Sequence, residues 1–208
     1  MAINADIHPQ QFKTGRDDLD EDTVKIYKRS LATEYNVYLP IDIPQKHETF
    51  LDFFNILTTA TDPDIINVHI ANYGGSVHTG FRLARYLKAC SARVIMHVDG
   101  NCYSMGAILA LCGHGMTTTK GIELMFHNFS AVQSGKGHEL EASVESITRN
   151  FQHNLKLFCK PFLTEKEIIE IAHDKDLYVV TGTKDFTERL NRHFGATPCK
   201  KTKPSSLT

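Results

Sequence analysis

The chain has 208 residues, 41% hydrophobic and 23% charged, which are ordinary values for a globular protein with one substantial core. A formal net charge of -1 without a basic stripe argues against nucleic acid as the main partner, and no apolar run approaches the roughly 20 residues of a membrane helix. Five cysteines without a C-x-x-C pair or a zinc-type cluster favour a reducing compartment. We therefore expect a soluble, cytoplasmic, single-domain protein without a metal.

Strands, turns and helices alternate in the first 130 residues, after an arm (1–30) that mixes charge with little apolar periodicity. Three repeats of a strand–turn–helix unit predict an α/β fold, a parallel sheet with helices on its faces. The site of such a sheet lies at the carboxyl ends of its strands. The predicted strands are 36–39, 65–70, 93–98, 116–119 and 123–126, and the predicted helices are 49–59 and a segment after Ser76.

The most informative stretch runs from Val94 to Gly113: a buried strand, a tight turn with Ser104, and a wholly apolar helix. Gly100 and Gly106 flank the serine in the pattern G-x-x-x-S-x-G. A hydroxyl at a helix start lies beside unpaired backbone N–H groups, as on the strand–turn–helix elbow of serine hydrolases. The alternative is that Ser104 only caps the helix, because serine is a preferred N-cap residue.

A serine nucleophile needs a base and a group that orients the base. Among eleven histidines, His127 ends an apolar strand that follows the Ser104 unit, so its ring can reach the same crevice. Two carboxylates, Asp174 and Asp176, lie near the last predicted strand, 177–180. Asp176 directly precedes that strand, whereas Asp174 is expected at the end of the preceding helix.

Residues 139–160 carry one apolar stripe at spacings of three or four, which predicts a helix ~30 Å long. We expect a helix of another subunit to cover this stripe, and packing against its own domain is the alternative. Pro161 ends the helix, and a capping box at Thr164 starts the next one, 165–173; a last helix is predicted at 184–193. The stripe consists of Leu140, Val144, Ile147, Phe151, Leu155 and Phe158.

Four motifs occur in the order and rough spacing of the Clp protease proteolytic subunit family, which the chain resembles over about 35–195. They are Gly74-Gly75, Ser104-Met105-Gly106-Ala107, Met125-Phe126-His127-Asn128 and Asp176-Leu177-Tyr178. The resemblance implies a ClpP/crotonase-like spiral of repeated β-β-α units. It also implies a peptidase domain at 31–197 and a protruding "handle" helix at about 138–160. The tail at 198–208 is basic and poor in apolar residues, and we expect it to be disordered.

The resemblance further implies a serine endopeptidase with Ser104 as nucleophile, His127 as general base and acid, and Asp176 orienting the imidazole. The backbone N–H groups of Gly75 and Met105 would form the oxyanion hole. An extended substrate would pair with main chain beside these groups, so that specificity would be broad. The expected substrate-binding residues are Gly74, Ser76, Asn128 and Phe129.

Members of this family form seven-fold rings with the active sites inside. The resemblance therefore implies polypeptide substrates, a homo-oligomeric heptameric ring, and the option of two rings stacked into a tetradecamer. A separate AAA+ unfoldase would use ATP. The chain itself has no G-x-x-x-x-G-K-[ST] loop and is expected to need no cofactor.

Two positions depart from the family pattern. Tyr73 replaces the proline that usually precedes the paired glycines, and 129–133 replaces a glycine-rich strand. Tyr73 can pack over the oxyanion turn, whereas the bulkier strand can alter the substrate groove. The departures indicate a divergent relative and leave three alternatives: a phage head-maturation (prohead) protease without an ATPase, an inactive ring subunit, and an acyl-CoA enzyme of the crotonase fold. The last requires a carboxylate in the crevice, and no suitable glutamate lies at the Ser104 turn.

Overall fold

The computed structural model describes residues 32–132, 134–173 and 175–195. The predicted arm (1–30) and tail (198–208) lie outside these residues, so the domain boundaries stay predictions. None of the described helices combines the length and the apolarity needed to cross a membrane.

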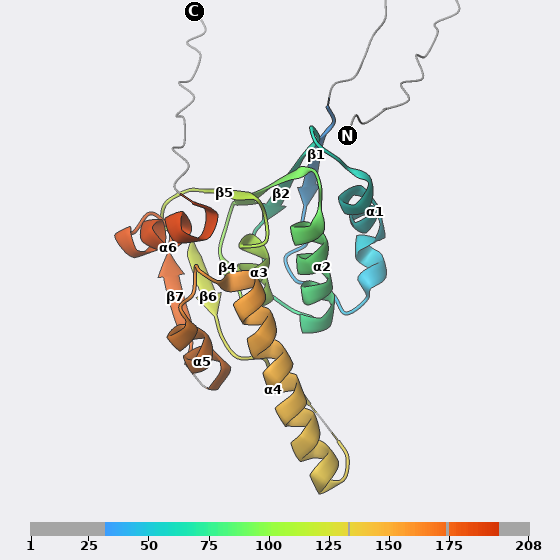
Figure 1. The fold of residues 1–208 in the computed structure, drawn as a ribbon, viewed down its shortest axis with the longest axis vertical. Coiled ribbons are helices and arrows are strands. Elements are labelled where there is room, and N and C mark those ends of the chain that lie inside the picture. Colours follow the sequence, from blue (N-terminus) through green and yellow to red (C-terminus); the bar gives the residue numbers. More distant parts are fainter. Residues whose placement is uncertain (1–31, 133, 174, 196–208) are drawn as a thin grey trace, which may run out of the picture. The chain divides into compact units, whose positions relative to one another are not determined.

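Four strands form the main sheet in the order β1-β2-β3-β5, and every neighbouring pair is parallel (Figure 1). The predicted parallel sheet is therefore confirmed, and two of its strands have the predicted ends. The strands are β1 (Glu34–Tyr38), β2 (Ile65–Ile70), β3 (Arg93–Val98) and β5 (Gly115–Thr118).

Helices cover one face of this sheet, where alternate residues such as Val68 of β2 and Met96 of β3 are fully buried. Among the described residues, no helix covers the opposite, open face, which is mainly polar, although parallel sheets are normally covered on both faces. The helices on the covered face are α1 (Leu51–Thr59), which follows a 3-10 turn at His47–Phe50, α2 (Val77–Ala89) and α3 (Met105–Ala110).

One row of side chains crosses the open face. The ring of Tyr38 stacks on His69 with centroids 4.4 Å apart, and His69 stacks on His97 at 4.8 Å. A hydrogen bond of 2.7 Å joins the Thr117 hydroxyl to Nδ1 of His97. This row links all four strands.

A second, smaller sheet has the order β4-β6-β7. The sequence predicts two strands on either side of the turn at Lys120-Gly121. Both exist, but β5 pairs with β3, whereas the strand after the turn pairs with β4 and β7. The chain thus crosses from the main sheet to the small sheet at this turn. The small sheet consists of β4 (Cys102–Tyr103), β6 (Glu123–Phe126) and β7 (Leu177–Val180).

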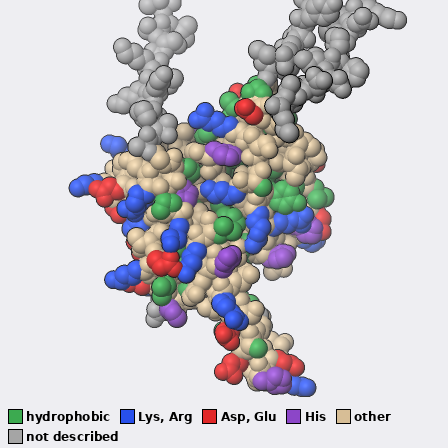
Figure 2. All heavy atoms as spheres, viewed as in Figure 1, with side chains coloured by type: hydrophobic (Ala, Val, Ile, Leu, Met, Phe, Trp, Pro, Cys, Tyr) green, Lys and Arg blue, Asp and Glu red, His purple; other side chains and the backbone are tan. Residues whose placement is uncertain are grey.

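The long helix α4 (Gly137–Cys159) has two different halves. In its C-terminal half Phe151 and Phe158 are buried against Phe81 of α2, with ring centroids 6.1 and 5.9 Å apart. In its N-terminal half Val144 is 53% exposed. This half extends away from the sheets, and charged and histidine side chains predominate at its end (Figures 1 and 2). Packing against the same domain therefore accounts for only part of the stripe.

Helices α5 (Glu165–His173) and α6 (Lys184–Phe194) flank β7. The capping box is confirmed, since the Thr164 N–H donates to Glu167 (2.8 Å) and the Glu167 N–H donates to the Thr164 hydroxyl (3.2 Å). Arg189 of α6 also donates to both oxygens of Glu167, at 2.7 and 3.0 Å. Burial alone raises the pKa of Glu167, but hydrogen bonds from Arg189 and Thr164 outweigh it and lower the pKa to about 2. The ionised pair fixes α6 on α5.

Candidate active site

Ser104 lies between β4 and α3 with φ 55° and ψ -123°, and no other non-glycine residue of the described ranges has a positive φ. Such a backbone conformation costs about 1–3 kcal/mol and persists only where the surroundings hold it. The same strained bend exposes the nucleophile of serine hydrolases. Although Ser104 occupies the N-cap position of α3, its side chain makes no capping hydrogen bond. This argues against the alternative that Ser104 only caps the helix.

Backbone hydrogen bonds hold the serine turn from two sides. The N–H of Ser104 donates to the carbonyl of Met125 in β6 (2.7 Å), and the N–H of Tyr103 donates to the carbonyl of Asn72 (2.9 Å). The turn is therefore fixed both to the small sheet and to the segment that follows β2.

Asn72 is fully buried and connects this segment to the glycine turn. Its side-chain amide donates to the carbonyl of Pro40 (2.7 Å), and its side-chain oxygen accepts from the N–H of Gly74 (2.8 Å). Asn72 was not among the site residues expected from the sequence. The sequence feature that could have pointed to Asn72 is its place as a polar residue between a buried strand and a glycine pair.

The glycine turn lies directly against the serine side chain. Gly74 and Gly75 have φ values of 106° and 122°, and a Cβ on Gly74 would lie 2.7 Å from Cβ and 3.2 Å from Oγ of Ser104. Ile43 pairs along the other side of the turn, donating to the carbonyl of Gly74 (2.6 Å) and accepting from the N–H of Ser76 (2.8 Å). This pairing leaves the N–H of Gly75 without a hydrogen-bond partner among the described residues.

Close glycine contacts bring α3 to the turn. A Cβ on Gly106 would overlap the backbone carbonyl oxygen of Asn72 and lie 2.7 Å from its side-chain oxygen. A Cβ on Gly80 of α2 would overlap the side chain of Met105. Met105 is the first residue of α3, so its N–H has no partner four residues earlier within the helix.

The register of β6 with β7 sets His127 opposite Asp176. The last registered pair of this antiparallel ladder is Phe126 with Leu177, and His127 and Asp176 come next on the two strands. Both residues therefore lie at the same end of the small sheet as Ser104, which directly follows β4.

The parallel register of β4 with β6 ends one residue before Ser104, so Ser104 lies beside Phe126. The structure thus brings the backbones of Ser104, His127 and Asp176 to one end of the small sheet. No hydrogen bond or ion pair within the described ranges joins the three side chains. Asp174, the other carboxylate considered, lies outside the described residues. The triad therefore stays a prediction.

The predicted substrate-binding residues have partners of their own. The N–H and carbonyl groups of Gly74 are bonded within the chain, and so are those of Ser76, whose carbonyl accepts from Gly80 (2.9 Å). The Asn128 side chain donates to the carbonyl of Ala172 at the end of α5 and accepts from the N–H of Phe129, both at 2.9 Å. Asn128 therefore ties the segment after His127 to the chain that leads into β7.

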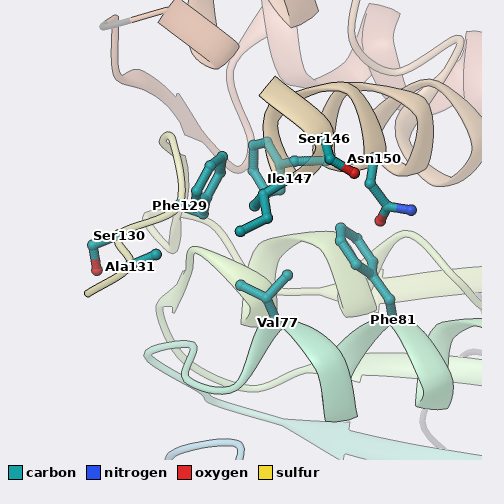
Figure 3. Close-up of a pocket in the computed structure, with 9 residues that line it drawn as sticks. Val77, Phe81, Phe129, Ser130, Ala131, Ser146, Ile147 and Asn150 are labelled. Carbon is teal, nitrogen blue, oxygen red and sulfur yellow. The ribbon is translucent and has the colours of Figure 1, made fainter. Parts of the chain in front are cut away.

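A pocket of about 330 Å³ flanks this arrangement, between the start of α2, the middle of α4 and residues 129–131 (Figure 3). Phe129 packs edge-on against Phe151 at 5.3 Å. Val77 of the pocket follows the glycine turn almost directly, and Phe129 lies two residues after His127. The pocket walls are mainly apolar, with polar groups from Ser130, Ser146 and Asn150.

Other chemistry near the site is limited. Cys102, two residues before Ser104, is fully buried, and burial raises the pKa of its thiol to about 11. The thiol is therefore protonated at neutral pH and is a poor nucleophile. Within the described ranges, no three His, Cys, Asp or Glu side chains are grouped to share a metal ion.

A family model described as Clp protease matches residues 19–183, which is most of the chain and includes all three predicted catalytic residues. The chain belongs to the Clp protease family. The resemblance inferred from the sequence motifs is confirmed, and membership implies a peptidase, which is a hydrolase. No curated protein matches the sequence.

Proposed function

We propose that this member of the Clp protease family is a serine endopeptidase. Ser104 Oγ attacks the scissile carbonyl, and His127 accepts the hydroxyl proton and later delivers a proton to the leaving amine. Asp176 orients the imidazole and stabilises its charged form. The observation that carries the proposal is the strained, uncapped Ser104 turn in contact with the glycine turn.

The oxyanion hole is formed in this proposal by the N–H groups of Gly75 and Met105. Support comes from the hydrogen bonds of the glycine turn, which occupy its Ile43 side and leave the Gly75 N–H free within the described residues. Two preorganised donors stabilise the negative charge that develops on the carbonyl oxygen in the transition state. The reaction then needs no cofactor, because side chains and backbone supply the nucleophile, the base and the charge stabilisation.

The substrate is an extended polypeptide. Its main chain pairs along the free edge of the glycine turn, and one apolar side chain enters the pocket between α2, α4 and Phe129. The described cysteines, Cys90, Cys102, Cys112 and Cys159, are free thiols, which fits a reducing compartment such as the cytoplasm.

A fluorophosphonate probe tests the catalytic assignment. The wild-type chain is expected to be labelled at Ser104 and Ser104→Ala to take up no label, since the hydroxyl forms the covalent bond. His127→Ala should be labelled at least ~10²-fold more slowly, the usual cost of losing a general base. Ser91→Ala, at an exposed serine away from the site, serves as the matched control. The proposal would be refuted if Ser104→Ala were labelled at the wild-type rate, or if the wild-type chain were not labelled at all.

We further propose that the chain works as a homo-oligomeric heptameric ring, alone or stacked into a tetradecamer, with the N-terminal half of α4 as the handle that contacts other subunits. Exposed Val144 and the open face of the main sheet support subunit contacts. An AAA+ unfoldase partner and the alternative prohead-protease role both stay predictions from the resemblance.

Val144→Glu tests the assembly. We expect a smaller mass by light scattering with an unchanged circular dichroism spectrum, because a charge replaces an apolar contact between subunits. Ala142→Glu adds the same charge to the opposite side of α4 and should leave the mass unchanged. Equal masses for wild type and Val144→Glu would contradict this role for α4.

A further inference from the structure

Two turns must keep a fixed spacing if the proposed mechanism operates. Ser104 Oγ attacks the carbonyl carbon while the N–H of Gly75 binds the carbonyl oxygen, so the distance between them determines whether both contacts form. Both turns have unusual backbone angles, with φ 55° at Ser104 and 122° at Gly75. In each case a tyrosine comes just before, Tyr103 before the serine and Tyr73 before the glycine pair.

The two tyrosine rings stack on each other. Their centroids are 5.5 Å apart and their planes differ by 25°. The stack joins the segment that follows β2 to the strand that leads into the serine, next to the backbone hydrogen bond between the Tyr103 N–H and the Asn72 carbonyl.

Tyr103 is held by further polar contacts. Its hydroxyl accepts from the side-chain amide of Asn101 (2.9 Å), and the side-chain oxygen of Asn101 accepts from the N–H of Glu123 (3.0 Å). Glu123 is the first residue of β6, the strand that leads to His127. The Tyr103 ring is thus a fixed platform tied to the small sheet.

Tyr73, in contrast, is 53% exposed, and its ring stacks on that of Tyr103. Its burial therefore contributes little to the core. The position requires explanation, because a large aromatic ring lies half in solvent one residue before a turn with two positive φ values.

We propose that the Tyr73–Tyr103 stack is a positioning device that sets the spacing between the Gly75 N–H and the Ser104 hydroxyl. This inference rests on the proposed peptidase function. Neither ring acts on the substrate: Tyr103 holds the serine turn in place, and Tyr73 places the glycine turn against it.

The test is the rate of acylation of Ser104 by a fluorophosphonate, measured with the full chain as a function of probe concentration. Tyr73→Ala and Tyr103→Ala should each lower the rate at saturating probe by about tenfold or more, with the half-saturating concentration unchanged. The double variant should be no slower than the slower single variant, because either change removes the same stack. Tyr73→Phe keeps the ring and should react within about twofold of wild type.

The matched control is Tyr38→Ala. Tyr38 is also an exposed ring stacked on another ring, that of His69, but it lies on the open face of the main sheet. Tyr38→Ala should therefore leave the acylation rate of Ser104 unchanged. Thermal unfolding of every variant shows which are folded at the assay temperature. If Tyr103→Ala is not folded, the acylation rates of Tyr73→Ala and Tyr73→Phe are compared instead, and this comparison tests the positioning role.

The outcomes separate the two proposals. If wild type is labelled and Tyr73→Ala reacts at the wild-type rate, the positioning role alone is overturned. The same holds if Tyr73→Phe reacts as slowly as Tyr73→Ala. Single effects that multiply in the double variant also overturn it. A wild-type chain that takes up no probe at Ser104 overturns the peptidase proposal and the positioning role together.

Discussion

Replacing Gly75 by alanine is expected to slow the acylation of Ser104 by about 10²–10³-fold, the usual effect of losing one oxyanion donor. Gly75 has φ 122°, which an alanine adopts only with strain, and the new Cβ would overlap the backbone carbonyl oxygen of Ile43. Because the obstructing atom belongs to the backbone, no side-chain rotation relieves the overlap. The glycine turn must shift, and the N–H shifts with it. The measurement is the fluorophosphonate rate below the unfolding midpoint of the variant.

Gly121→Ala is the matched control for the backbone strain. Gly121 has φ 86°, and its added Cβ would meet nothing within 4 Å. It lies in the turn between β5 and β6, at the opposite end of β6 from His127. We expect a lower unfolding midpoint in both variants but a slower reaction in Gly75→Ala alone. Equal acylation rates in the two variants would remove Gly75 from the oxyanion hole.

The main sheet could be predicted from the sequence because its strands carry local signals. Strands 65–70 and 93–98 have their predicted ends, since each is an apolar run between turn residues. The two residues of β4 carry no periodic signal. They form a strand because Met125 and Asn72, distant in the sequence, pair with this segment. The second sheet is thus a tertiary effect that local patterns do not record.

The stripe on α4 shows a second limit. Its spacing is the same in both halves of the helix, yet Phe151 is buried and Val144 is exposed. Periodicity indicates which face of a helix is apolar, but the element that covers this face depends on where the helix leaves the domain.

The candidate site shows the same division. Ser104 and the glycine turn were predictable because parallel strands end at one edge of their sheet. The choice between Asp174 and Asp176 rested on position beside a strand, and the β6–β7 register places Asp176 opposite His127. Asn72 could not be assigned a role, since its hydrogen bonds go to backbone groups that have no signature in the sequence.

Asn72→Leu is expected to lower both stability and acylation. Leucine has a similar size but forms no hydrogen bonds, so the N–H of buried Gly74 would be left unpaired, whereas the carbonyl of exposed Pro40 would turn to solvent. A buried unpaired group costs about 1–3 kcal/mol, which predicts a loss of about the same size in the free energy of unfolding. The glycine turn also loses its anchor beside Ser104. The acylation rate should therefore fall by at least about tenfold in protein that remains folded.

Thr181→Val separates these two effects. The buried hydroxyl of Thr181 has the same pair of bonds, donating to the carbonyl of Thr119 (2.6 Å) and accepting from the N–H of Ile122 (2.9 Å). It lies at the end of the small sheet away from His127. A comparable loss of stability with an unchanged acylation rate is expected, as judged by urea unfolding and probe labelling. If both variants slow acylation equally, the role of Asn72 is only structural. If Asn72→Leu alone slows it, the reaction depends on how the glycine turn is held, because both variants lose a side chain that bonds one N–H and one carbonyl, and only Asn72 bonds to the glycine turn.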